Sequence, residues 1–93
     1  MMYAEKIKMQ QGCSNSDNTQ EIAEIYIDGC KEPGFYSRAT LHEHLTEKPN
    51  SIKVNKGPNY PYLRPATSIN GVKYVRSEPN DTPHDNLLAL PRV

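Results

Sequence analysis

The chain has 93 residues, a mass of 10.5 kDa, 11 basic against 11 acidic residues and an apolar share of 35%. This size predicts one small domain over residues 1–93, and zero net charge argues against a general polycation that coats nucleic acid. The mean hydropathy is −0.79, no apolar run approaches the ~18 residues of a membrane span, and residues 1–10 do not resemble a signal peptide, so we expect a cytoplasmic protein without membrane contact.

Two cysteines, Cys13 and Cys30, lie in or beside polar loop segments. A secreted domain with so few apolar residues would normally carry more disulfides, so reduced thiols are the simpler interpretation. A Cys13–Cys30 bridge is the less favoured alternative, compatible with the hairpin that their flanking segments suggest.

Alternating apolar and polar residues predict two paired strands in the N-terminal third. Tyr3–Gln10 is the first, with Tyr3, Ile7 and Met9 on one face. Turn-forming residues over 11–20 predict a mobile loop. Glu21–Asp28 is the second strand, antiparallel to the first, with Ile22 on the face opposite to Ile25 and Ile27.

One helix is predicted, over Arg38–Glu47. Ser37 is a good N-cap, and Leu41 and Leu45 are spaced to share a buried face. Pro49 forbids continuation of the helix because it lacks an N–H and its ring clashes with the preceding turn.

The C-terminal half predicts a short strand, an extended loop and a hairpin. Ser51–Asn55 alternates as a strand, and three prolines in Gly57–Pro65 predict a polyproline-like loop. Asn70-Gly71 predicts a two-residue type I′ turn within a hairpin over Ala66–Ser77. The order of elements predicts an α+β fold with one small, mostly antiparallel sheet and one short helix on one of its faces.

A turn over Glu78–Pro83 and an apolar tail close the chain. Leu87, Leu88 and Leu90 predict that the tail 84–93 docks on the core. The tail and the preceding strand, Gly71-x-Lys73-Tyr74-x-Arg76-Ser77 and Asp85-Asn86-Leu87-Leu88-x-Leu90-Pro91, resemble a family of short bacterial proteins that form a domain of unknown function. The resemblance supports the fold and implies no activity, cofactor or site residue.

No arrangement of residues predicts a metal, a cofactor or a catalytic centre. His42 and His44 are two positions apart on the predicted helix, about 200° around its axis, so they cannot chelate one ion. No phosphate-binding glycine loop or nucleophile motif is present. An enzyme would need His84, Asp85 and one cysteine to converge in a pocket, and we regard this as the third hypothesis.

Charge is divided unevenly along the chain. Residues 1–47 hold eight acidic and four basic residues, whereas residues 48–93 hold seven basic and three acidic ones. Basic groups beside tyrosines suit single-stranded nucleic acid or a phosphorylated ligand. The candidate residues for such binding are Lys53, Arg64, Lys73, Tyr74 and Arg76. From sequence alone the structural interpretation is favoured: outward strand lysines, tyrosine rings packed in the core, and a positive region facing the acidic half.

Asp85-Asn86 is the polar centre of the C-terminal motif. It either contacts a ligand or, as we favour, forms an Asx-type turn that docks the tail. The first functional hypothesis is therefore a non-enzymatic module that binds an unknown protein partner, as a monomer or weak homodimer. Nucleic-acid or phosphate binding through residues 48–77 is the alternative.

Overall fold

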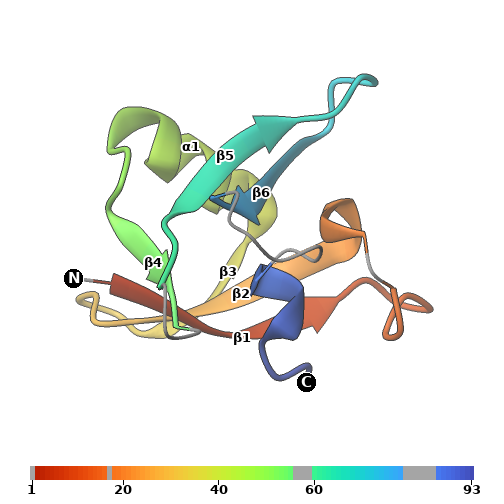
Figure 1. The fold of residues 1–93 in the computed structure, drawn as a ribbon, viewed down its shortest axis with the longest axis horizontal. Coiled ribbons are helices and arrows are strands. Elements are labelled where there is room, and N and C mark those ends of the chain that lie inside the picture. The colour runs from red at the N-terminus through yellow and green to blue at the C-terminus, as the bar shows by residue number, and fades with distance from the viewer. Residues whose placement is uncertain (1, 17, 56–59, 79–85) are drawn as a thin grey trace.

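The computed structural model describes residues 2–16, 18–55, 60–78 and 86–93. Within them the chain forms strands, one α-helix and two short 3-10 helices (Figure 1). In chain order these are β1 (Met2–Met9), η1 (Thr19–Glu21), β2 (Ile22–Asp28), β3 (Gly34–Ser37), α1 (Arg38–Glu47), β4 (Ile52–Val54), β5 (Leu63–Thr67), β6 (Lys73–Ser77) and η2 (Asn86–Ala89).

The predicted α+β class is confirmed, and the strands form two sheets. A four-stranded sheet has the order β3-β2-β1-β4, with β4 parallel to β1 and the other pairs antiparallel. The β5–β6 hairpin forms a separate two-stranded sheet, so the expectation of a single sheet is wrong. In Figure 1 the hairpin and α1 lie together on one side of the larger sheet.

The core lies between these layers and contains side chains from every strand except β3. The helix contributes Leu41 and Leu45, as predicted. Ser37 caps the helix, since its hydroxyl accepts a 3.2 Å hydrogen bond from the Thr40 N–H. The other buried apolar residues are Ala4, Ile7, Met9, Ile22, Ile25, Ile27, Ile52, Val54, Leu63, Val75, Leu87 and Leu90.

Two β-bulges change which residues face this core. Ala4 pairs with Ile27 and Lys6 pairs with Tyr26, so Glu5 is an extra residue in β1. Ala4 therefore shares the core face with Ile7, and the placement of Tyr3 on that face was wrong.

A second register shift lies near the other end of the same strand pair. Met9 pairs with Ile22 while Lys8 pairs with Glu24, which leaves Ala23 as the extra residue of β2. Ile22 is buried beside Ile25, contrary to the prediction that it would lie on the opposite face.

Two strands extend into segments that were predicted to be loops or left unassigned. β5 begins at Leu63, inside the predicted polyproline-like loop, and contains Pro65 opposite Val75. A strand in a two-stranded sheet has a free edge that tolerates a proline. β3 is only four residues long and runs directly into α1, and so it carried no periodic signal.

The hairpin turn has three residues rather than two. The Gly71 N–H bonds to the Ser68 carbonyl at 2.9 Å, and the Ser68 N–H bonds to the Val72 carbonyl at 2.9 Å. Gly71 has a positive φ of 83°, whereas Asn70 does not have a positive φ. This is a turn closed by a left-handed glycine, so the predicted type I′ turn is wrong.

The C-terminal residues 86–93 pack against the start of the chain. Leu87 and Leu90 are buried, and Leu88 is partly buried. The Ile7 N–H bonds to the Pro91 carbonyl at 2.9 Å, and the Val93 N–H bonds to the Ile7 carbonyl at 3.0 Å. In the described part of the chain, no helix is long and apolar enough to cross a membrane.

Candidate functional site

The outward face of the β5–β6 hairpin collects most of the basic and aromatic candidates. Arg64 lies directly opposite Arg76, and Tyr74 lies opposite Ala66 on the same face. The alternate residues Leu63 and Val75 point to the core and are buried. Period-2 alternation therefore turns three of the candidate residues, Arg64, Tyr74 and Arg76, toward solvent together.

Lys53 joins this face from the neighbouring sheet. An antiparallel bridge connects Lys53 of β4 with Tyr62, the residue before β5. Paired residues in a bridge point their side chains the same way, and the Lys53 ammonium lies 5.2 Å from the centre of the Tyr62 ring. We call Lys53, Tyr62, Arg64, Tyr74 and Arg76 the basic–aromatic face.

The two arginines of this face differ in their partners. Arg64 pairs with Glu78 at 2.5 Å, and both side chains are more than one-third exposed. Arg76 is exposed and makes no ion pair with the described residues. An exposed ion pair contributes little to stability, so a phosphate could replace Glu78 as the partner of Arg64 at small cost.

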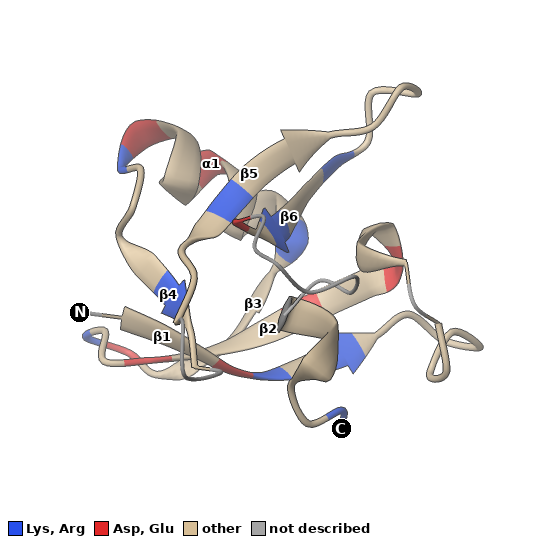
Figure 2. Ribbon diagram, viewed as in Figure 1, with Lys and Arg blue, Asp and Glu red and all other residues tan. Residues whose placement is uncertain are grey.

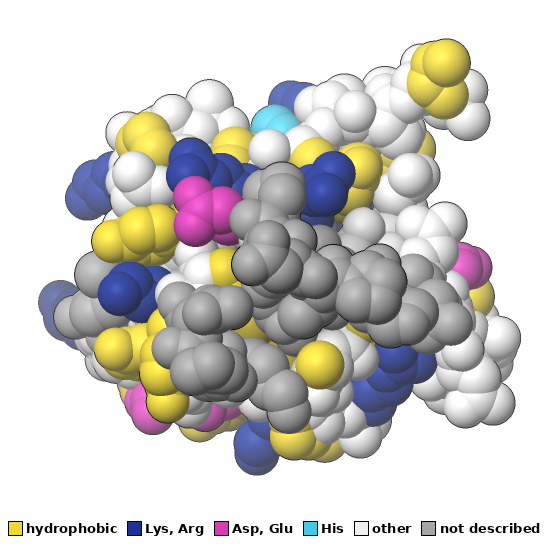
Figure 3. Space-filling model, viewed as in Figure 1, with side chains coloured by type: hydrophobic (Ala, Val, Ile, Leu, Met, Phe, Trp, Pro, Cys, Tyr) yellow, Lys and Arg dark blue, Asp and Glu magenta, His cyan; other side chains and the backbone are white. Residues whose placement is uncertain are grey.

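The charges along this face are visible from one direction. Figure 2 shows Lys and Arg on β4, β5 and β6, and Figure 3 shows their side chains on one surface, with apolar groups among them. Lys53, Arg64 and Arg76 supply three positive charges, against the negative charge of Glu78. Cations and tyrosine rings on one surface are the groups that contact the phosphates and bases of a single strand.

Lys73 faces the other way, toward the helix. It lines a groove of about 460 Å³ together with α1 residues that include Glu43 and Glu47. The expectation that basic residues of the second half face acidic residues of the first half thus describes Lys73. It does not describe Arg64, whose partner Glu78 belongs to the second half.

The remaining candidates, Asp85 and Asn86, add no described side chain to the site. Asp85 and His84 lie outside the described residues. Asn86 is the first residue of η2, and only its backbone is described. Both the Asx-turn interpretation and the hypothesis of an enzyme that uses His84 and Asp85 therefore concern residues outside the described part of the chain.

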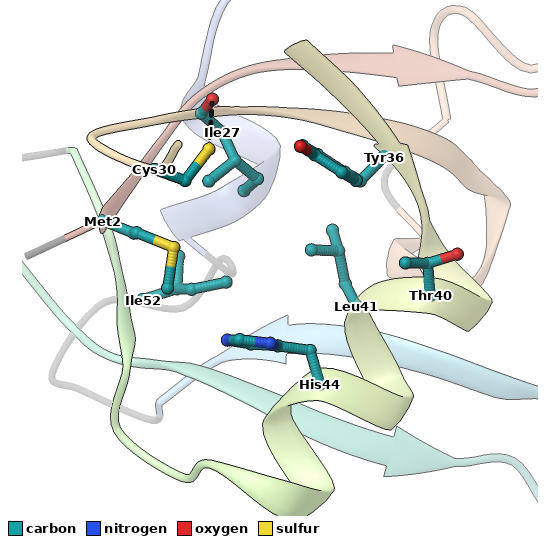
Figure 4. Close-up of a pocket in the computed structure, with 8 residues that line it drawn as sticks. All are labelled: Met2, Ile27, Cys30, Tyr36, Thr40, Leu41, His44 and Ile52. Atoms are coloured by element: carbon teal, nitrogen blue, oxygen red, sulfur yellow. Dashed lines mark hydrogen bonds between the residues drawn. The ribbon is translucent and has the colours of Figure 1, made fainter. Parts of the chain in front are cut away.

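A separate apolar pocket of about 160 Å³ lies between α1 and the larger sheet (Figure 4). Ile27, Leu41 and Ile52 form its buried walls, and Cys30 and His44 carry polar atoms at opposite ends of it. The Cys30 thiol is 3.8 Å from the Ile27 carbonyl, and His44 Nε2 is 3.1 Å from Ser51 Oγ. The pocket therefore does not hold a thiol–imidazole pair.

Tyr36 also lines this pocket. Burial raises the pKa of its hydroxyl, and the neighbouring Cys30 and Glu32 raise it further. The hydroxyl donates a hydrogen bond to the Glu32 carbonyl. Tyr36 is thus held neutral, with its proton already shared with the backbone.

Both cysteines are free thiols. Cys13 donates a 2.9 Å hydrogen bond from its thiol to Glu21 Oε2, and Ser16 donates to Glu21 Oε1. These bonds lower the pKa of Glu21, and the bond to Glu21 raises the pKa of Cys13. A thiol with a raised pKa is a weaker nucleophile at neutral pH, so the network suits a structural role for this loop.

His42 and His44 have separate partners, Thr67 at 3.4 Å and Ser51 at 3.1 Å. Among the described residues, no group of three His, Cys, Asp or Glu side chains is arranged to hold a metal ion.

A family model described as "Protein of unknown function (DUF3892)" matches residues 5–91. The chain belongs to this family. The DUF3892 match spans the sheet, the helix, the hairpin and most of the tail, so the basic–aromatic face lies wholly within the family's domain. The resemblance to a domain of unknown function is confirmed to this extent. No curated protein and no solved structure matches the DUF3892 chain significantly.

Sequence reasoning missed Glu78, and it counted Tyr62 among the tyrosines of residues 48–77 without choosing it as a candidate site residue. Counting back by two from Arg64 places Tyr62 on the same face of a strand. The three prolines concealed that strand. Glu78 follows β6 and its N–H bonds to the Tyr62 carbonyl at 2.8 Å, a long-range contact that no local pattern signals.

Proposed function

We propose that the basic–aromatic face binds single-stranded nucleic acid. One observation carries this proposal: Arg64, Tyr74 and Arg76 share the outward face of one hairpin, and Lys53 and Tyr62 extend it. The arginines and the lysine would contact phosphates, and the tyrosine rings would stack on bases. Stacking requires unpaired bases, so a duplex should bind less tightly than a single strand.

A direct test measures the fluorescence anisotropy of labelled oligothymidylate and oligouridylate, each of about a dozen nucleotides, at low salt. We expect the wild-type chain to bind both and to bind duplex DNA of the same length more weakly. The variant Arg76→Gln should bind several-fold less tightly. Lys73→Gln is the matched control, because it removes the same charge from the opposite face of the same hairpin.

Two results of this experiment would overturn the proposal. One is the absence of an anisotropy change with either single strand. The other is an equal loss for Arg76→Gln and Lys73→Gln, which would mean that only the overall charge matters.

A protein partner is the second candidate function. It rests on a different observation: among the described residues β3 pairs only with β2, so its outer edge can pair with a strand of another protein molecule, which includes a second copy of this chain.

We propose further that the Gly71–Ser77 strand and the Asp85–Pro91 ending are marks of this family, and that the protein is bacterial and cytoplasmic. The resemblance of those segments supports the first point, and the two free thiols agree with a reducing compartment.

A further inference from the structure

β3 is a free edge of the four-stranded sheet, whereas the chain itself covers the opposite edge. β3 pairs only with β2 in the described part of the structure. At the other edge, the Val54 N–H of β4 bonds to the Pro61 carbonyl at 2.8 Å. The C-terminal residues 91–93 pair with Ile7 beside β4. A strand edge leaves every second backbone N–H and C=O without a partner in the sheet.

β3 is short, which limits the edge that it exposes, but its sequence carries no other feature that usually protects such an edge. Its residues, Gly-Phe-Tyr-Ser, include no charge and no proline, and its register with β2 is regular over all four pairs. Phe35 is 38% exposed and contacts the ring of Tyr26 edge to face at 5.3 Å. An uncharged, regular edge with an exposed aromatic ring is a surface on which another strand pairs.

We propose that β3 pairs antiparallel with β3 of a second copy of this chain, which joins two four-stranded sheets across a two-fold axis. Antiparallel pairing is identical from either side, so one interface satisfies both free edges. Because β3 has no charged side chain, the two copies meet without repulsion between like charges. Dimerisation also adds buried apolar area to a small chain with an apolar share of 35%.

Symmetry restricts the register of this pairing. Hydrogen-bonded and non-hydrogen-bonded pairs alternate along an antiparallel ladder, and two facing residues always belong to the same kind of pair. The two-fold axis must therefore pass midway between one residue and the same residue of the second copy. Phe35 fits this position because its ring lies on the outer face and is partly exposed. Tyr36 does not fit, because its ring lines the pocket on the inner face.

The first test is the mass in solution, measured by sedimentation equilibrium over a wide range of concentrations. We expect the wild-type mass to rise toward twice 10.5 kDa with concentration. Phe35→Lys should remain a monomer. Ile69→Lys is the matched control, because Ile69 is a fully exposed apolar residue at the hairpin tip, and it should dimerise like the wild type.

A second variant tests the register even where Phe35→Lys folds poorly. Phe35→Cys should form a disulfide between two copies on mild oxidation, because residues directly opposite each other have Cα atoms within disulfide range. Peptide mapping should place the bond at residue 35 rather than at Cys13 or Cys30. An Ile69→Cys control should cross-link much more slowly.

A wild-type chain that stays monomeric at every concentration would overturn the proposal, as would a dimer that Phe35→Lys leaves intact. Cross-linking of Phe35→Cys no faster than that of Ile69→Cys would overturn the register. These outcomes are independent of nucleic-acid binding, since β3 contributes no residue to the basic–aromatic face.

Discussion

Lys53 holds its ammonium 5.2 Å from the centre of the Tyr62 ring, and the backbones of the same two residues form a bridge between the sheets. The bridge makes the outer surface of the larger sheet continue into the outer surface of the hairpin. Lys53 would otherwise be an isolated strand lysine. Tyr62 thus has two functions in this account: it positions a cation and offers a ring for stacking.

Tyr62→Leu should weaken oligonucleotide binding by roughly 5- to 150-fold, the range for the loss of one stacked base. The free energy of unfolding should fall by no more than about 1 kcal/mol, since an exposed cation–π contact contributes only that much. Tyr26→Leu is the control, because Tyr26 has a lysine, Lys6, 5.1 Å from its ring centre but lies on β2. Equal losses of affinity in the two variants would contradict a stacking role for Tyr62.

Gly71→Ala should lower the free energy of unfolding by about 1–2 kcal/mol, the cost of placing a Cβ in the left-handed region. The cost comes from the backbone alone, because Gly71 has a φ of +83° and a Cβ there would meet nothing within 4 Å. Gly34→Ala in β3 has the same free space without the positive φ and should not destabilise the fold. Urea unfolding of both variants checks this, and equal midpoints would argue against the three-residue turn.

Leu87→Ala should cost about 2–5 kcal/mol, because its side chain is fully buried and truncation leaves a cavity. Leu88→Ala should cost less, since Leu88 only borders the core. The sequence did not distinguish the leucines of the tail, whereas the structure assigns a larger effect to Leu87 than to Leu88. Denaturant unfolding distinguishes the two, and a Leu87→Ala variant as stable as the wild type would mean that the tail does not dock.

Glu21→Gln should accelerate alkylation of Cys13 by iodoacetamide at mildly alkaline pH. Its carboxylate accepts the thiol hydrogen bond and raises the Cys13 pKa, so its removal increases the thiolate fraction. Mass spectrometry of the alkylated peptide gives the rate. An unchanged rate would mean that the thiol–carboxylate bond does not persist in solution.

The same network sets two pH limits on stability. The folded-state pKa of Glu21 is lowered, so its contribution is present above its unfolded pKa and is lost as pH falls through the folded value. The pKa of Cys13 is raised, so its contribution is present below its unfolded pKa and is lost as pH rises through the folded value. Cys13→Ala should flatten the alkaline limit of a stability–pH curve, and an unaltered curve would contradict this.

Local chemistry was sufficient to predict the helix, whose N-cap Ser37 and following proline Pro49 fix its ends. It was sufficient for β2 as well, except that Ile22, the first residue of this strand, faces the core rather than the opposite side. The bulge at Glu5 could not be predicted, because it depends on how β1 pairs with β2, and it exchanges Ala4 for Tyr3 in the core. An alternating pattern fixes faces only within an unbroken register.

The placement of some site residues could likewise be predicted from local sequence, whereas the placement of others depends on long-range contacts. The outward position of Arg64 and Arg76 could be anticipated from alternation, although Pro65 concealed the strand that carries Arg64. The contact of Lys53 with Tyr62 and that of Arg64 with Glu78 depend on how the sheets are joined. The direction of Lys73 toward the helix is likewise a tertiary feature.

The salt dependence of binding tests the central claim most directly. The logarithm of the association constant for a single strand falls with the logarithm of salt concentration by about 0.7 for each phosphate contacted. Three contacts, from Lys53, Arg64 and Arg76, predict a slope of about −2, and Arg76→Gln should reduce its magnitude by about 0.7. Lys73→Gln should leave the slope unchanged. A slope near zero for the wild type, or one that Arg76→Gln does not alter, would contradict nucleic-acid binding through the basic–aromatic face.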